Sequence, residues 1–208
     1  MFCALVFIVS MTVSADDKKI TSVVNLYGVT FQYGAPPWAV DAPNPLSAVK
    51  PYRNQQGNNF ILEFIPADEE FDSWKTMFAV SAMRNNRTVP VDPWIDYSLA
   101  TLKRVCKGYR DKILHRTDKV ALVQMSCPRV VGAPMKGYEG GMGEIGIFAF
   151  LVQDEVLINH HIEWRGKAFD PDDKATWPVD QDQIDIAISI MREAKAIKED
   201  SVVSFGQP

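Results

Sequence analysis

The residues best suited to chemistry are His160, His161 and Glu163, which fall within four positions of one apolar segment. Imidazole and carboxylate groups are common zinc ligands, and a catalytic zinc usually takes three ligands from the protein. Since the segment alternates like a strand, His161 and Glu163 share one face and His160 lies on the other. The third ligand would have to be His115 or a remote carboxylate, and nothing in the sequence places either beside the pair.

We therefore interpret His160 as a histidine at the edge of the core with its hydrogen bonds satisfied, and His161 and Glu163 as polar surface residues. A small hydrolase or metal-dependent enzyme centred on His161 and Glu163 stays open as an alternative. No cofactor is predicted, because no other pattern in the chain supplies a cofactor site.

Other motifs lack the context that their chemistry requires. Residues 141–146 match G-x-G-x-x-G, but a dinucleotide site needs a helix after the glycines, and the apolar run here is typical of a strand. Residues 170–173 begin like a calcium loop, but Lys174 and Ala175 stand where an EF-hand needs an oxygen ligand and a glycine. The chain has no G-x-S-x-G, H-E-x-x-H or Walker sequence, so no catalytic residue is predicted.

Aromatic residues in irregular segments are candidates for contact with a partner. Trp38 and Trp177 stand beside prolines, and Tyr52 and Tyr138 also fall outside the expected regular elements. Rigid aromatic side chains on loops fixed by proline make good anchors at an interface. The alternative is that these loops fold back over the sheet and use the tryptophans as lids.

Cysteine usage indicates an oxidising compartment. Cys3 lies in the first fifteen residues, so a chain without them keeps Cys106 and Cys127. An even pair in an exported protein is most simply a disulfide, which here would stabilise the fold by about 3 kcal/mol. Two separate buried thiols are the alternative.

The first fifteen residues have the pattern of a secretory signal peptide, with an apolar run followed by Val13, Ser14 and Ala15. No lysine or arginine precedes the run, and the alternatives are a buried strand or a short membrane anchor. We predict a signal peptide over 1–15 and a flexible segment over 16–25. The protein would then be periplasmic or secreted.

Composition indicates one globular domain, expected over 26–198, with a loose tail over 199–208. Hydrophobic residues make up 47% and charged residues 23% of the 208-residue chain, values that are ordinary for a soluble domain. A net charge of −4 argues against a nucleic-acid partner, which needs a basic face. No further segment is long and apolar enough to span a membrane once the signal is cleaved.

Hydrophobic periodicity predicts an α+β fold with a mostly antiparallel central sheet and helices packed on it, because strands and helices are segregated along the chain. Asp92 and Asp180 are expected to cap helices. We expect strands over 29–33, 60–65, 120–125, 145–152 and 155–165, helices over 71–82, 92–113 and 181–194, an ordered proline-rich loop over 35–51 and a polar turn over 53–59.

The chain resembles the Mog1/PsbP-like fold, a helix-sheet-helix sandwich found in many exported bacterial proteins. The resemblance rests on the order of the elements, together with the signal-like start and the lack of a catalytic motif. The resemblance covers about residues 26–198 and brings no family site residues with it. It implies a protein that binds partners or assists assemblies. We therefore expect an exported, non-catalytic binding or accessory protein that contacts another envelope or extracellular protein through its proline-rich and aromatic loops. An apolar-ligand carrier is a further alternative.

Overall fold

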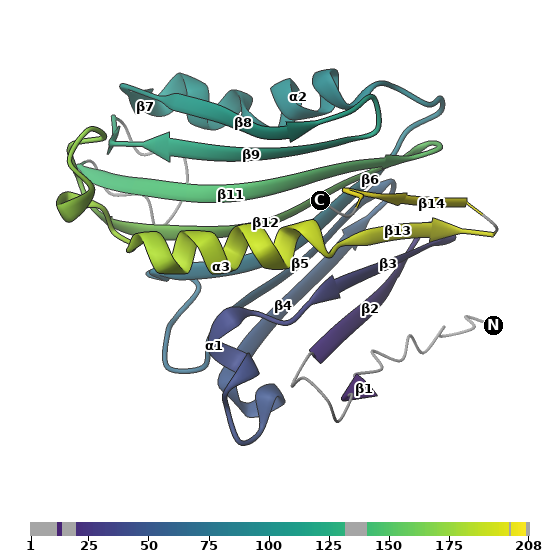
Figure 1. Cartoon of the computed structure of the whole chain (residues 1–208), viewed down its shortest axis with the longest axis horizontal. Helices are drawn as coiled ribbons and strands as arrows, with labels where there is room; N and C mark the ends of the chain where they lie inside the picture. Colours follow the sequence, from purple (N-terminus) through teal and green to yellow (C-terminus); the bar gives the residue numbers. More distant parts are fainter. Residues whose placement is uncertain (1–11, 14–19, 132–140, 200, 207–208) are drawn as a thin grey trace.

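Seven antiparallel strands form the main sheet of the computed structural model, which describes residues 12–13, 20–131, 141–199 and 201–206. Their order across the sheet is β4-β5-β6-β12-β11-β9-β8 (Figure 1). The bounds are β4 Val49–Gln56, β5 Asn59–Pro66, β6 Thr76–Arg84, β8 Arg110–Arg116, β9 Val120–Cys127, β11 Met142–Gln153 and β12 Val156–Lys167. The predicted α+β class with a mostly antiparallel sheet is confirmed.

A second antiparallel sheet joins the two ends of the described chain. Its order is β1-β2-β3-β13-β14, with bounds β1 Thr12–Val13, β2 Ile20–Leu26, β3 Val29–Gly34, β13 Lys195–Lys198 and β14 Ser201–Ser204. Two short strands, β7 Cys106–Lys107 and β10 Arg129–Val130, pair separately.

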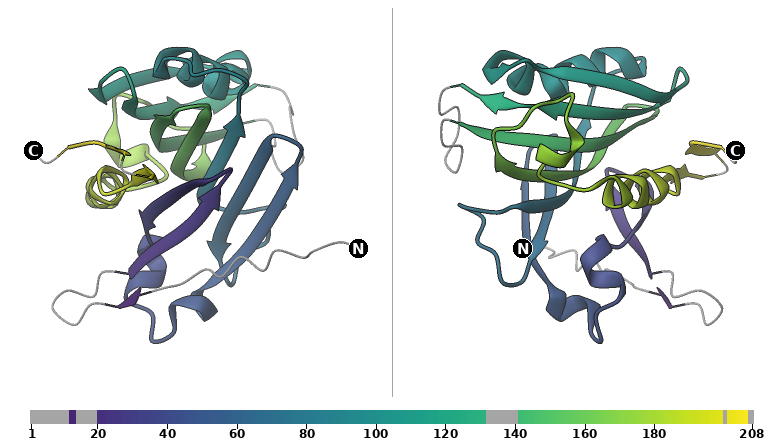
Figure 2. Two further views of the ribbon diagram at one scale, coloured as in Figure 1. Left: turned by 90° about the vertical axis from the view of Figure 1, so that its right-hand side faces the viewer. Right: turned by 60° about the vertical axis from the view of Figure 1, so that its left-hand side comes forward.

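Helices α2 (Val91–Val105) and α3 (Gln181–Arg192) pack on opposite faces of the main sheet (Figures 1 and 2). Asp180 caps α3 as predicted, because its carboxylate accepts a hydrogen bond from the amide of Gln183. The proline-rich segment forms the short helix α1 (Pro37–Val40) and a 3-10 turn over Pro45–Ala48, and a second such turn covers Lys174–Thr176. Among the described residues, no helix is both long and apolar enough to cross a bilayer.

The two faces of β12 contribute to different parts of the core. Ile158 and Ile162 pack with α3 and the second sheet, whereas Leu157 packs with α2. The arms of the β11–β12 hairpin are 12 residues each, and the turn lies at Asp154 and Glu155, one residue later than the expected strand limits placed it. Because β11 lies inside the sheet with structure on both faces, most of its sequence reads as a nearly continuous apolar run.

The helix expected over 71–82 is wrong, because Thr76–Arg84 is the strand β6. Residues 77–80 are all buried, and they alternate between the two sides of the sheet. A short run that is apolar on both faces satisfies the helical and the strand period together, which explains the error.

Polar edge strands account for the other corrections. The expected turn over 53–59 belongs mainly to β4, whose residues are exposed because it lies at an edge of the sheet. Residues 20–25, expected to be flexible, lie in β2, and 201–204 of the expected tail form β14. Helix α2 ends at Val105 rather than near 113, and the chain continues into β7 and β8.

Candidate binding groove beside α2

A row of polar side chains lies on the face of β12 that points toward α2. Asn159, His161, Glu163 and Arg165 alternate there with the apolar residues of the opposite face. The expectation that His161 and Glu163 lie on the surface is wrong, since their side chains are only 13% and 10% exposed. They are covered because β12 is a central strand, and His161 stacks on the ring of Phe148 at 5.1 Å.

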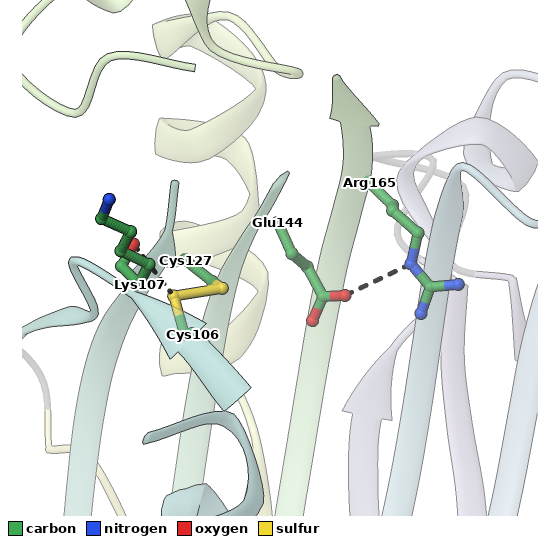
Figure 3. The surroundings of a disulfide bond; sticks show 5 residues. All are labelled: Cys106, Lys107, Cys127, Glu144 and Arg165. Atoms are coloured by element: carbon green, nitrogen blue, oxygen red, sulfur yellow. Dashed lines mark hydrogen bonds and ion pairs between the residues drawn. A yellow bond between two sulfur atoms is a disulfide. The ribbon is translucent and has the colours of Figure 1, made fainter. Parts of the chain in front are cut away.

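Arg165 and Glu144 form an ion pair at the end of this row, with Arg165 Nε 3.3 Å from Glu144 Oε2 (Figure 3). Both side chains are almost completely buried. The guanidinium of Arg165 also lies over the ring of Trp74 at 3.6 Å from its centroid. A planar guanidinium suits both contacts, because it is weakly hydrated and binds an aromatic face as well as a carboxylate.

Burial and the charge of Glu144 hold the pKa of the Glu163 carboxyl well above its usual range, although Arg165 opposes them. Burial and then the neighbouring His160 lower the pKa of His161 to about 3. His161 Nε2 lies 4.0 Å from Glu163 Oε2, but at neutral pH the imidazole is uncharged. The contact is therefore not an ion pair.

His160 lies on the opposite face, deep in the core rather than at its edge as expected. It is completely buried, its Nδ1 lies 3.0 Å from the carbonyl oxygen of Ala79, and its ring packs 4.6 Å from that of Phe78. Burial lowers the pKa of His160 to about 4. The hydrogen bonds are only half satisfied, since Nε2 has no partner within the described chain.

The metal-dependent alternative finds no complete ligand set. His115 pairs with Leu122 across β8 and β9, and Leu122 belongs to the face that carries His160. His115 therefore lies on the opposite side of the sheet from His161 and Glu163. Within the described ranges, no group of three or more histidine, cysteine, aspartate or glutamate side chains could hold a metal ion.

A groove runs along the sheet beside α2, next to the polar row. Its floor includes one residue from each of β4, β5, β6 and β12, and each of these residues is paired with the next across the sheet. One face of α2 forms its wall. The groove consists of two adjoining hollows of about 480 and 290 Å³, which share Ser81, Trp94 and Tyr97. The four floor residues are Asn54, Ile61, Ser81 and Asn159, and the wall adds Trp94, Tyr97, Ser98, Thr101 and Arg104.

Two polar atoms in this groove lack partners. Asn159 is only 7% exposed, yet its Oδ1 has no hydrogen-bond partner among the described residues, and the same holds for Ser98 Oγ. Tyr97 is 67% exposed and stacks on Trp94 with ring centroids 5.6 Å apart. Trp94 is fixed in turn, because its Nε1 donates to the carbonyl of Ile158 at 3.1 Å. The groove thus offers a rigid aromatic platform and unused hydrogen-bonding capacity.

The aromatic residues expected to contact a partner are not brought together on one surface. Trp38 is half-buried against the ring of Phe78, and Trp177 is half-buried with its Nε1 donating to the carbonyl of Asp170 at 3.2 Å. Tyr52 is 45% exposed. Tyr138 lies outside the described residues. The packing of both tryptophans against the core fits the alternative in which the loops cover the sheet.

Gly143 and Gly146 of the G-x-G-x-x-G match serve close packing within β11, and the match leads into a strand rather than a helix. A Cβ at Gly146 would stand 2.4 Å from the ring of Phe148 and 3.2 Å from Cγ of Glu163. Glycine therefore leaves room for both side chains. Residues 170–173 form a hydrogen-bonded turn that leads into the 3-10 turn over Lys174–Thr176.

The predicted disulfide between Cys106 and Cys127 is confirmed, with Cα atoms 5.5 Å apart (Figure 3). Cys106 directly follows the last residue of α2, and Cys127 ends β9. The bond therefore ties the helix that forms the groove wall to the main sheet. Disulfides of this kind are typical of proteins in oxidising compartments.

A further hollow of about 700 Å³ lies between α3 and the second sheet. Charged side chains such as Asp185, Arg192, Glu193 and Lys195 line it. An apolar ligand would have to desolvate these charges, so this hollow does not suit the apolar-ligand carrier.

Comparison with known protein families, with curated proteins and with solved structures found no match. The resemblance to the Mog1/PsbP-like fold thus stays a prediction from the order of elements.

Proposed function

We propose that this protein is an exported, non-catalytic binding protein and that its ligand occupies the groove beside α2. The disulfide supports a periplasmic or extracellular site of action, as does the signal-like pattern of the first fifteen residues. The groove is better suited to binding than the proline-rich and aromatic loops, because Trp38 and Trp177 in those loops are already half-buried.

One observation carries this proposal, the unpartnered Oδ1 of Asn159, which is buried beneath the groove that the residue lines, so that a rotation of its side-chain amide is needed to present it to a ligand. An unsatisfied polar atom at a buried position costs about 1–3 kcal/mol of stability. A ligand that donates a hydrogen bond to this oxygen recovers that free energy on binding. The exposed ring of Tyr97 provides a further contact within reach of the same ligand.

The test is an NMR titration of the isotope-labelled protein with a set of sugars, amino acids and nucleosides. We expect shift changes for the side-chain amide of Asn159 and for backbone amides of α2. Tyr97→Ala should abolish these changes, whereas Ile186→Ala, at an exposed position on α3 on the other side of the sheet, should keep them. Shift changes confined to the hollow beside α3 would contradict the proposal.

A second candidate function rests on the raised pKa of Glu163. A carboxyl whose pKa is raised by burial can act as a general acid, and Glu163 lies on the same face of β12 as Asn159. An enzyme of this kind would turn over an ester, glycoside or phosphate substrate, and Glu163→Gln would remove that turnover. A panel of chromogenic substrates in which both proteins are equally inactive would reject this candidate.

A further inference from the structure

The chemistry of the groove lining indicates which class of ligand it fits. Arg104 is the one charged residue among the described residues that line its two hollows. A polyphosphate or nucleic acid needs several cations to neutralise it, so the groove is poorly suited to a polyanion. An apolar ligand is equally unsuited, because it would bury the exposed side-chain amides of Asn54 and Gln56 without hydrogen bonds.

Amide side chains are concentrated along the sheet floor. Asn54, Gln56, Asn59 and Asn159 come from three strands, and the first three line the hollow toward the edge of the sheet. Each side-chain amide carries an NH2 donor and an oxygen acceptor that lie in one plane. Neighbouring hydroxyl groups on a ring both donate and accept, so they match such an amide better than a ligand that can only accept or only donate.

Tyr97 adds the apolar contact that a polyhydroxylated ring requires. Its ring lines both hollows and is held from beneath by Trp94. The electron-rich face of an aromatic ring attracts groups with partial positive charge, such as the C–H bonds on the apolar side of a sugar ring. From Asn159 to Asn54 the floor crosses three strand spacings, or about 14 Å, which is longer than a single sugar ring.

We propose that the groove beside α2 binds an uncharged carbohydrate, with a sugar ring stacked on Tyr97 and its hydroxyl groups hydrogen-bonded to Asn159 and the amides of β4 and β5. This inference rests on the proposed function, because it names the ligand class of the same groove. The combined hollows fall within the range of small-molecule sites, roughly 300–1,000 Å³.

The test is calorimetric titration of the full chain with neutral hexose and N-acetylhexosamine oligomers of increasing length. We expect saturable binding of at least one oligomer. Tyr97→Ala should weaken it about tenfold, as expected for the loss of an aromatic contact, and Asn159→Leu should weaken it at least as much. Tyr97→Phe is the matched control and should bind like the unchanged protein, because it keeps the ring.

The other outcomes separate this inference from the proposed function. If the neutral oligomers fail but an amino acid, a nucleoside or an acidic sugar shifts the amide of Asn159, the carbohydrate inference falls and the groove remains the binding site. If no probe perturbs Asn159 or α2, both fall. Carbohydrate binding that survives Tyr97→Ala and Asn159→Leu would place the sugar elsewhere and would also overturn the inference.

Discussion

Replacing Asn159 with leucine tests whether this side chain is kept for binding or for folding. Asn159 is almost fully buried on a central strand, and its Oδ1 has no partner among the described residues. Leucine is branched at Cγ as asparagine is, has no polar atoms, and can extend its larger side chain toward the adjoining groove. The structure therefore predicts that Asn159→Leu makes the unliganded protein more stable while it removes binding in the groove.

The expected gain is the cost that the unpaired oxygen now imposes, about 1–3 kcal/mol. For a chain of 150–250 residues, 1 kcal/mol moves the midpoint of thermal unfolding by about 2–4 °C. The variant should therefore melt roughly 2–12 °C higher than the unchanged protein. A gain of this size from an asparagine on a central strand is unusual, because most substitutions destabilise.

The assay is thermal and urea unfolding of the two proteins without ligand. Asn25→Leu is a matched control, since Asn25 Oδ1 accepts a hydrogen bond from the amide of Gly28 at 3.0 Å. That variant should lose about 1 kcal/mol, so the same substitution should have opposite effects at the two positions. If Asn159→Leu instead lost more than about 1 kcal/mol, the oxygen would be satisfied in the folded protein and the reasoning would fail.

Three further predictions concern the disulfide and the buried ionisable groups. Alanine at both Cys106 and Cys127 should lower the free energy of unfolding by about 3 kcal/mol, as measured in urea, because the cross-link closes a loop with a sequence separation of 21; an unchanged value would contradict a stabilising role. Glu163→Gln should be more stable than the unchanged protein at pH 8 and similar at pH 4. A raised folded-state pKa costs stability as pH rises above the unfolded value, so equal pH profiles would be the contrary result. The folded pKa of His160 is lowered to about 4, so this residue should cost about 3 kcal/mol as pH falls from 6.5 to 4. Unfolding measured across that window should show a smaller acid loss for His160→Phe, and an unaltered acid loss would refute the assignment.

The sequence predicted the parts of the fold that have one clear period. The hairpin β11–β12 and the cap of α3 at Asp180 follow from local patterns, and the disulfide follows from an even cysteine count. The expected cap of α2 at Asp92 is wrong, because the helix begins at Val91 after Pro90 and Asp92 lies in its first turn. Strand β6 was mistaken for a helix because its buried run fits both periods. Polar strands such as β4 give no apolar signal, because they lie at a sheet edge.

The candidate groove could be predicted only in part. Alternation along β12 assigned Asn159, His161, Glu163 and Arg165 to one face, but it could not tell whether that face was exposed. The sequence did contain one indication that these polar residues are buried, because they alternate with apolar residues inside a hairpin that is otherwise apolar. The pairing of Asn159 with Ser81, and the position of Tyr97 above them, depend on contacts between distant parts of the chain. No periodicity within one segment encodes such contacts.

The most direct measurement is an experimental structure of the mature protein purified from its natural source with any bound molecule retained. The account predicts additional density between the ring of Tyr97 and the side-chain amide of Asn159, with a hydrogen-bond donor within about 3.2 Å of Asn159 Oδ1. Density for a bound molecule elsewhere, with the groove beside α2 filled only by ordered water, would contradict it.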